Sequence, residues 1–244
     1  MKLNHVLIYF SLLLFSCGCD SNSNSDSLIS DFIIDIDPEV FMKETSTIEC
    51  VILDVRTKEE INNGYLLNAS FIDYYDPKFL EKASWINKNL PVFVYCHAGG
   101  RSSKAAQQLI GLGFEKVYNL KGGYSQWKES DFPVEQGAGE LHQSYPLYQI
   151  QELESMLDSS DNALLVFKTP WCIPCKKLDT VIERVINSHK EWDIVIINMD
   201  QNPKAAEYFN VKSVPTILAY HKQELFYTHI GFIDYIDLIS SLLQ

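Results

Sequence analysis

The fold class of this chain is decided by the stretch from Val92 to Ser103, which reads VFVYCHAGGRSS. Residues 92–95 are β-branched and aromatic, and such a short run predicts a buried strand. A loop with Cys96 follows, and from Ser102 to Leu112 apolar residues recur at helical spacing before Gly113, a typical helix end. A strand that leads through a tight loop into a helix is typical of a parallel sheet covered on both faces.

The same alternation of strands and helices continues on both sides of this stretch. We expect two α/β domains, a parallel-sheet domain over residues 28–136 and a domain with a mixed sheet over 144–244, joined by a linker at 137–143 that contains Gly137 and Gly139. Strands are predicted over 51–53, 117–120, 163–167, 194–197, 216–220 and 225–230, and further helices over 147–157, 172–186 and 236–243.

Length and composition fit this organisation. The 244 residues are enough for two domains of ordinary size, and a content of 46% hydrophobic and 21% charged residues is that of a globular protein. The net charge of -12 argues against a nucleic-acid partner, because phosphate binding needs a basic face. A small anionic substrate stays compatible with it, since backbone N–H groups and one arginine can bind an anion locally.

The first 16 residues resemble a bacterial lipoprotein signal peptide. Lys2 precedes an apolar run from Val6 to Phe15 that is too short to span a bilayer. The run ends in LFSC at 14–17, which resembles a lipobox and implies that Cys17 receives the lipid. Cys19 is a weaker candidate for that role.

Residues 17–27 are polar and predict a tether between the anchor and the first domain. We therefore expect an exported, membrane-anchored lipoprotein that faces the periplasm of a Gram-negative bacterium. A cleaved secretory signal with incidental cysteines is the alternative, and it also implies export.

The loop after the first strand carries a candidate nucleophile. Cys96 follows a parallel strand, and the carboxyl ends of such strands are where α/β proteins bind ligands. The glycines let backbone N–H groups point inward, the helix start adds a positive dipole end, and Arg101 adds a charge that binds oxyanions. This environment stabilises a thiolate and can hold an anionic sulfur donor. The candidate binding residues are His97, Ala98, Gly99, Gly100, Arg101 and Ser102.

Three ordered motifs resemble the single-domain rhodanese family: YCHAGGRS at 95–102, GFEKVYNLKGG at 113–123 with Trp127, and DVR at 54–56 with Glu60. The resemblance covers residues 27–136 and implies a sulfurtransferase that forms a persulfide on Cys96. Four residues separate Cys96 from Arg101, as in sulfurtransferases, whereas related phosphatases and arsenate reductases have five. Asp54 and Arg56 favour a structural ion pair over a catalytic role. Tyr65 stands where the family often has His, and His97 and Ala98 replace commoner loop residues.

A second reactive centre is predicted at Cys172 and Cys175. They follow the apolar strand at 163–167 in the sequence PWCIPCKK, residues 170–177. At a junction of strand and helix, Cys172 lies at the helix N-terminus, which stabilises its thiolate, and Cys175 lies one turn inside, within reach to resolve a mixed disulfide. Zinc is the alternative, but it needs four ligands and no second pair is suitably spaced.

This segment resembles thioredoxin through WCIPCK at 171–176, NMDQNP at 198–203 and VKSVPT at 211–216. The resemblance covers 144–244 and implies that Trp171 flanks the pair and that Pro215 is a cis-proline facing it. The buried Asp of the family is replaced by Val166 and its Lys partner by Ile196. Both members of the family's buried ion pair are thus replaced by apolar residues, so no charge is left unpaired in the core. The nearby proton acceptor for Cys175 is also lost, and we therefore expect a slower or more specialised reductant.

These features lead to a coupled sulfur chemistry. Cys96 is expected to take sulfane sulfur from thiosulfate or a persulfide, after which Cys172 attacks that persulfide or an acceptor and Cys175 resolves the product. A thiol reductant must restore the pair, and neither metal nor organic cofactor is implied. One alternative is an exported thiol–disulfide oxidoreductase whose rhodanese unit only binds or delivers substrate. Another is a non-catalytic interaction protein built on both folds. Cys50 is expected to be a buried small hydrophobe, with a resolving thiol as the alternative.

Overall fold

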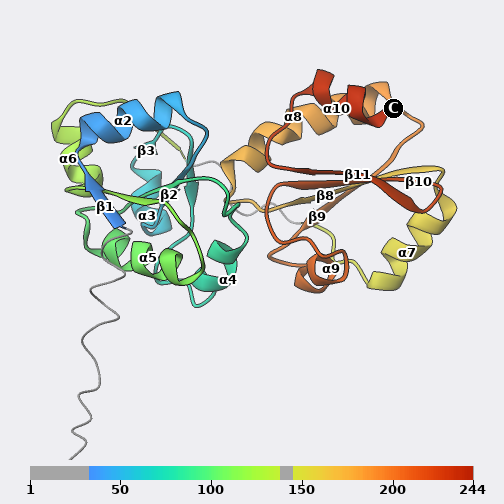
Figure 1. Ribbon diagram of the computed structural model, residues 1–244, viewed down its shortest axis with the longest axis horizontal. Coiled ribbons are helices and arrows are strands. Elements are labelled where there is room, and N and C mark those ends of the chain that lie inside the picture. Colours follow the sequence, from blue (N-terminus) through green and yellow to red (C-terminus); the bar gives the residue numbers. More distant parts are fainter. Residues whose placement is uncertain (1–32, 138–144, 244) are drawn as a thin grey trace, which may run out of the picture.

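The computed structural model describes residues 33–137 and 145–243, which form two α/β domains side by side (Figure 1). The predicted signal peptide, the lipidation site Cys17 and the tether at 17–27 lie outside the described residues, as does the linker beyond Gly137. Within the described ranges, none of the helices combines the length and the apolar character that a membrane span requires.

The first domain is built on a parallel sheet of five strands. Their order is β1-β6-β5-β2-β4, and every neighbouring pair is parallel. A separate antiparallel ribbon joins β3 (Tyr65–Leu66) to β7 (Val134–Glu135). The sheet strands are β1 (Ile33–Ile36), β2 (Val51–Asp54), β4 (Ala69–Phe71), β5 (Val92–Tyr95) and β6 (Val117–Leu120).

Helices cover both faces of this sheet. Helix α2 lies over one face and α5 over the other (Figure 1). On the α2 side, Phe41 packs edge-on against Phe93 of β5 and Trp127 of α6, with ring centroids 5.3 and 5.9 Å apart. The helices are α2 (Pro38–Thr47), α3 (Lys58–Asn62), α4 (Phe79–Ser84), α5 (Gly100–Gly111) and α6 (Gly123–Glu129).

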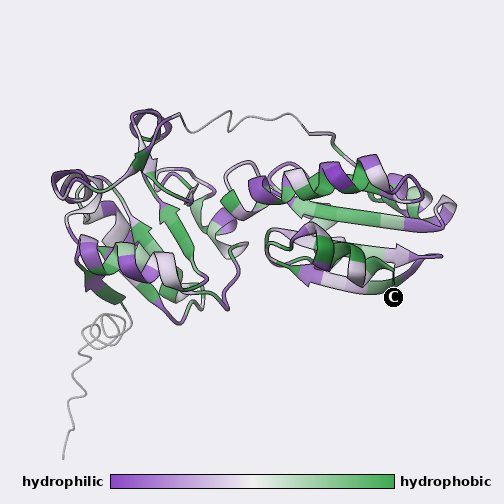
Figure 2. Ribbon diagram, turned by 90° about the horizontal axis from the view of Figure 1, so that it is seen from above, coloured by the Kyte–Doolittle hydropathy of each residue, from purple (hydrophilic) through white to green (hydrophobic). Residues whose placement is uncertain are grey.

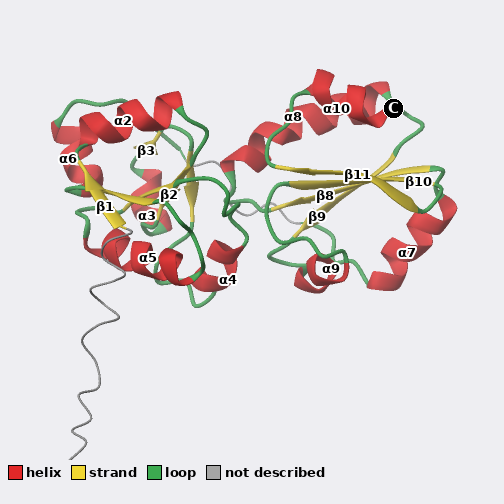
Figure 3. Cartoon of the chain, in the orientation of Figure 1, coloured by secondary structure: helices red, strands yellow, loops and turns green. Residues whose placement is uncertain are grey.

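The second domain has the mixed sheet that the sequence predicts. Its order is β11-β10-β8-β9, with β8 and β9 parallel and the other pairs antiparallel. Helices α8 and α10 cover one face, and α7 and α9 the other (Figure 3). The strands are β8 (Asn162–Lys168), β9 (Asp193–Asn198), β10 (Thr216–His221) and β11 (Glu224–Ile230); the helices are α7 (Ile150–Ser159), α8 (Ile173–Ser188), α9 (Pro203–Tyr208) and α10 (Tyr235–Leu242).

The domains are joined by main-chain hydrogen bonds, by one hydrogen bond to a side chain and by apolar packing. The N–H of Phe71, on edge strand β4, donates to the carbonyl of Trp171 at 3.0 Å, and the N–H of Val214 donates to the carbonyl of Trp85 at 2.9 Å. The N–H of Ile173 donates to Oγ of Ser70 at 3.1 Å. Apolar residues of both domains continue into one buried cluster. Many residues in the strands of both sheets are hydrophobic (Figure 2). The edge of the first sheet therefore docks on the Cys172 end of the second domain.

Candidate functional site

Cys96 lies at the carboxyl end of β5, at the base of a loop that curls around its sulfur. The N–H of Gly99 donates to Cys96 Sγ at 3.1 Å, and the hydroxyl of Ser102 donates to it at 3.4 Å. Gly99 adopts φ = 100°, a left-handed conformation that suits glycine, and this turn lets α5 begin at Gly100. The helix thus begins two residues before the predicted start at Ser102, which brings its positive end closer to the thiol.

The electrostatics of this loop favour the thiolate. Burial raises the pKa of the Cys96 thiol, but hydrogen bonds from the Ser102 hydroxyl and from the N–H groups of Ser102, Ala98 and Gly99 outweigh it, and the pKa falls below its ordinary value. The loop therefore favours the thiolate, which is the nucleophilic form of a cysteine.

Helix α6 also stabilises the Cys96 loop, through hydrogen bonds to its carbonyl groups. The N–H of Tyr124, at the start of α6, donates to the carbonyl of Cys96 at 2.8 Å, and the N–H of Ser125 donates to that of His97 at 3.0 Å. Gly123 makes this approach possible, because a Cβ there would lie 2.4 Å from the Cys96 carbonyl oxygen. The sequence motif at 113–123 therefore supports the reactive loop.

Arg101 is held by a carboxylate. Its two terminal nitrogens donate to Glu60 at 2.7 and 2.6 Å, and Glu60 also caps α3 through the N–H of Thr57. The Arg101 hydrogen bonds hold the pKa of Glu60 at about 2. Sequence reasoning expected Arg101 to face a donor anion, and it missed this carboxylate partner. His97 is 59% exposed and lies 3.2 Å from the hydroxyl of Ser125, and Ala98 is also exposed at the loop surface.

Asp54 and Arg56 form the structural ion pair that the sequence predicts. Both side chains are buried, and Nε of Arg56 donates to Asp54 at 2.9 Å. One terminal nitrogen of Arg56 reaches Asp54 at 2.6 Å and the carbonyl of Gly64 at 2.8 Å. The guanidinium stacks 4.0 Å from the ring of Tyr124. The pair thus connects β2 to the segment before β3 and to α6, which supports the Cys96 loop.

Cys172 and Cys175 form a disulfide at the start of α8, with Cα atoms 5.2 Å apart. Cys172 caps the helix, because its sulfur accepts the N–H of Cys175 at 3.2 Å. Trp171 flanks the pair and donates from Nε1 to Asp200 at 3.2 Å. The Val214–Pro215 peptide bond is cis, as the resemblance to thioredoxin implies.

Val166 and Ile196 face one another across β8 and β9, so the apolar replacement of the ion pair is present in the fold. Sequence reasoning missed a neighbouring pair. Lys168 lies two residues further along β8, with its side chain 4% exposed, and it pairs with Asp179, one helical turn after Cys175. A lysine that ends an apolar strand before a redox pair was the available signal.

Cys50 is placed differently from the expectation of a buried small hydrophobe. It precedes the first residue of β2 and is partly exposed. Together with Cys172 it lines a pocket of about 400 Å³ between the two domains. Burial, together with the charge of Glu49, raises the pKa of its thiol to about 11.

The structure does not bring Cys96 and Cys172 together. Cys96 follows β5, whereas Cys172 lies outside edge strand β4, and β2 stands between these strands. Two strand spacings alone amount to about 10 Å, far beyond the distance for attack of one sulfur on another. In addition, Cys172 faces the amino ends of β2 and β4, opposite the edge that carries Cys96. The domain contacts would have to break for a direct transfer within this chain.

Comparison with known proteins identifies both domains. A rhodanese-like domain model matches residues 37–130, and a thioredoxin model matches 147–243. Thiosulfate sulfurtransferase 18 of Arabidopsis thaliana is 35% identical over 94 residues, which cover 34% of this chain and 69% of the relative. Thioredoxin of Buchnera aphidicola is 30% identical over 86 residues, which cover 35% of this chain and 80% of the relative. The chain belongs to the rhodanese family in its first domain and to the thioredoxin family in its second.

A crystal structure of a rhodanese-related protein from Thermoplasma volcanium is similar to the rhodanese domain, with 25% identity and a TM-score of 0.38 over 42% of this chain and 97% of that one. Family membership supports sulfurtransferase chemistry in the rhodanese domain and thiol–disulfide chemistry in the thioredoxin domain. In the described ranges there is no group of three or more His, Cys, Asp and Glu that could hold a metal ion.

Proposed function

We propose that this protein takes sulfane sulfur from thiosulfate or a persulfide onto Cys96 and couples that transfer to thiol–disulfide exchange at Cys172 and Cys175. The observation that carries the proposal is the loop around Cys96, whose N–H groups and Ser102 hydroxyl lower the pKa of the thiol. With thiosulfate, the thiolate attacks the outer sulfur, the S–S bond breaks, and sulfite leaves with the electron pair.

The second half of the reaction removes the sulfur. A thiol attacks the outer sulfur of the Cys96 persulfide and restores the Cys96 thiolate. When the reduced Cys172 receives this sulfur, Cys175 attacks Cys172 Sγ, so that sulfide leaves and the disulfide forms. The dithiol gives up two electrons and the sulfane sulfur accepts them. A thiol reductant outside this chain then restores the pair.

The N-terminal sequence supports an exported setting. The apolar run, the lipobox-like LFSC at 14–17 and the polar segment after it are what a lipoprotein precursor carries. We place the lipid on Cys17 and the two domains on the periplasmic side of a Gram-negative membrane. Replacement of Cys17 by Ser is expected to release the protein from the membrane fraction and to remove the lipid mass.

The function is tested by intact mass after incubation with thiosulfate. Wild type is expected to gain about 32 Da at Cys96 as a persulfide, and Cys96→Ser is expected to gain none. A chain that reduces disulfides but gains no sulfur from thiosulfate or from a small persulfide would instead be an exported oxidoreductase. In that case the rhodanese domain would only bind or deliver substrate.

A further inference from the structure

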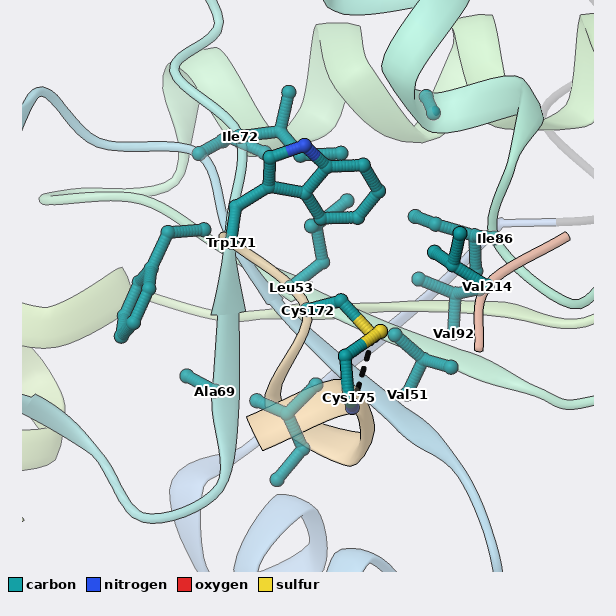
Figure 4. Packing of buried hydrophobic residues seen from close by; sticks show 14 of the residues in the cluster. Val51, Leu53, Ala69, Ile72, Ile86, Val92, Trp171, Cys172, Cys175 and Val214 are labelled. Atoms are coloured by element: carbon teal, nitrogen blue, oxygen red, sulfur yellow. Dashed lines mark hydrogen bonds between the residues drawn. A yellow bond between two sulfur atoms is a disulfide. The ribbon is translucent and has the colours of Figure 1, made fainter. Parts of the chain in front are cut away.

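The docked domains leave a pocket beside the disulfide. It has a volume of about 400 Å³ and lies between the amino ends of β2 and β4 and the redox end of the thioredoxin domain. Cys50 and Asn68 lie on the rhodanese side, and Cys172 and Pro215 on the thioredoxin side. Figure 4 shows the disulfide beside Val51, the residue that follows Cys50.

The docking covers the disulfide against large partners. Cys172 is 3% exposed and Cys175 is fully buried. The N–H of Phe71 and the carbonyl of Trp85, from the rhodanese domain, occupy the main-chain groups of Trp171 and Val214 next to the disulfide. A folded protein could not reach Cys172 without displacing β4, whereas a small molecule in the pocket could.

The pocket wall is mostly apolar, with side chains such as Ile86, Leu90 and Val214, and a few polar groups stand among them, so it suits a small thiol compound with both apolar and polar parts. Asn68, Ser70 and Asn87 supply amide and hydroxyl groups, and Lys177 and Glu49 supply one charge of each sign. Cys50 is a poor nucleophile in this pocket, because burial and the charge of Glu49 raise the pKa of its thiol to about 11. Cys96 lies at the opposite edge of the sheet, so neither free cysteine of the described residues is placed to react with Cys172.

We propose that this pocket admits a small-molecule persulfide that carries sulfur from Cys96 to Cys172. This proposal rests on the proposed function and names its acceptor, a low-molecular-weight thiol. It also accounts for the location of the two centres at opposite edges of the rhodanese sheet.

Each step of this transfer balances. The small thiolate takes the outer sulfur from the Cys96 persulfide, which leaves Cys96 as a thiolate and yields the small persulfide. In the pocket, the Cys172 thiolate takes that sulfur and releases the small thiol. Cys175 then attacks Cys172 Sγ and hydrosulfide leaves, so one sulfide is formed for each disulfide.

The experiment uses the reduced full chain carrying Cys96→Ser, so that Cys96 cannot react. Two probes are compared, cysteine persulfide and a persulfidated folded protein, and disulfide formation and sulfide release are followed in time. We expect cysteine persulfide to react at least about tenfold faster than the protein persulfide, because only the small probe fits the pocket.

Two variants test the pocket: one narrows it for the small probe, and the other weakens the domain contact that excludes the large probe. Ile48→Trp places a large ring at the pocket wall, where Ile48 is 43% exposed, and is expected to slow cysteine persulfide about tenfold. Ser70→Arg places a long charged side chain in the buried docking contact, and is expected to speed the protein persulfide about tenfold. Ser155→Arg, on the exposed surface of α7, is the matched control and is expected to change neither rate.

Equal rates for the two probes, or an unchanged cysteine persulfide rate in Ile48→Trp, would overturn the proposal. A second measurement does not need the Ser70→Arg variant. In the reduced chain carrying Cys96→Ser, Cys172 should react readily with iodoacetamide and slowly with a bulky polymer-linked maleimide. Failure of the proposed function is visible separately, because it shows as a missing mass gain on Cys96 in the wild-type chain.

Discussion

At the scale of single residues, reactivity depends on a balance between burial and hydrogen bonds. Cys96 is 2% exposed, which by itself would keep a thiol protonated. The Ser102 hydroxyl and the N–H of Gly99 reverse this effect by donating to the sulfur. The chain thus obtains a buried nucleophile that is ionised at lower pH than an ordinary cysteine.

Replacement of Ser102 by Ala removes one of these donors. A hydrogen bond of this kind contributes about 1 kcal/mol, so persulfide formation at neutral pH should fall roughly fivefold. The pH–rate profile should move to higher pH, because the Cys96 pKa rises. Stopped-flow measurement of sulfite release across pH checks both, with Ser103→Ala on the same helix as control. An unshifted profile would mean that the backbone N–H groups suffice.

Glu60 gives the fold a pH-dependent contribution. Its pKa is lowered from 4.5 to about 2, so the carboxylate stabilises the folded state above pH 4.5, and this contribution is lost as the pH falls towards 2. We expect the melting temperature of wild type to fall between pH 4.5 and 2. The melting temperature of Glu60→Gln should fall less over this interval, because the glutamine side chain does not titrate. Parallel melting curves for both proteins would contradict the prediction.

At the scale of elements, the Cys96 loop is stabilised by α6 as much as by α5. Gly123 has φ = 60°, and its missing side chain lets the main chain of α6 approach the carbonyl groups of Cys96 and His97. The glycine therefore determines the distance between an element and a reactive loop, although it carries no chemistry.

Gly123→Ala should distort this contact. A Cβ at 2.4 Å from a backbone oxygen forces a shift, and together with the left-handed φ it should cost about 2 kcal/mol or more in unfolding free energy. Sulfur loading on Cys96 should fall as the loop moves. Gly111→Ala, at the end of α5, has nothing within 4 Å of the added Cβ and should be neutral or slightly stabilising. Denaturant unfolding and intact mass measure the two effects.

Val166 and Ile196, which face one another across β8 and β9, predict that the thioredoxin domain reduces disulfides more slowly than a general thioredoxin. Val166 is 1% exposed and packs in the cluster beneath α8, so Val166→Asp would bury a carboxyl without a partner and should destabilise the domain by about 3 kcal/mol. If the missing acid limits the rate, the variant should still reduce a small disulfide faster. An unchanged or lower rate would count against the hypothesis that the missing acid slows this domain.

Much of the fold follows from the sequence because its buried strands are continuous apolar runs. β5 and β6 coincide with their predictions, and β2 and β8 to β11 agree within one residue at each end. Helix α7 begins three residues after the predicted Leu147, which is 70% exposed and precedes the helix. The short elements β1, β4 and α4 were not predicted, since so few residues show no periodicity.

The candidate site was likewise predictable from the sequence only in part. The pairing of Cys172 with Cys175, the Asp54–Arg56 ion pair and the cis peptide bond before Pro215 were predictable from motifs. The docking of the domains was not predictable, because its hydrogen bonds use mainly the main-chain groups of Phe71 and Trp85, and a side-chain pattern does not show which main-chain groups are free to pair. The pocket with Cys50 is a consequence of that docking.

At the scale of the whole molecule, the arrangement of the domains decides how the two centres communicate. The rhodanese centre opens at the carboxyl edge of its sheet, and the disulfide faces the opposite edge. Fusion keeps the two centres at a fixed one-to-one ratio, but it does not tether a small carrier that moves between them.

This arrangement predicts that coupling depends on a small thiol. The reduced wild-type chain, loaded at Cys96 with thiosulfate and freed of excess donor, should form the Cys172–Cys175 disulfide slowly by itself. Cysteine should accelerate disulfide formation and sulfide release at least about tenfold, because it supplies the carrier between the two edges. Cys172→Ser should transfer sulfur to cysteine and yet release little sulfide, since its dithiol is missing. Rapid disulfide formation without cysteine, at a rate independent of protein concentration, would mean instead that the domains separate and Cys172 reaches Cys96 directly.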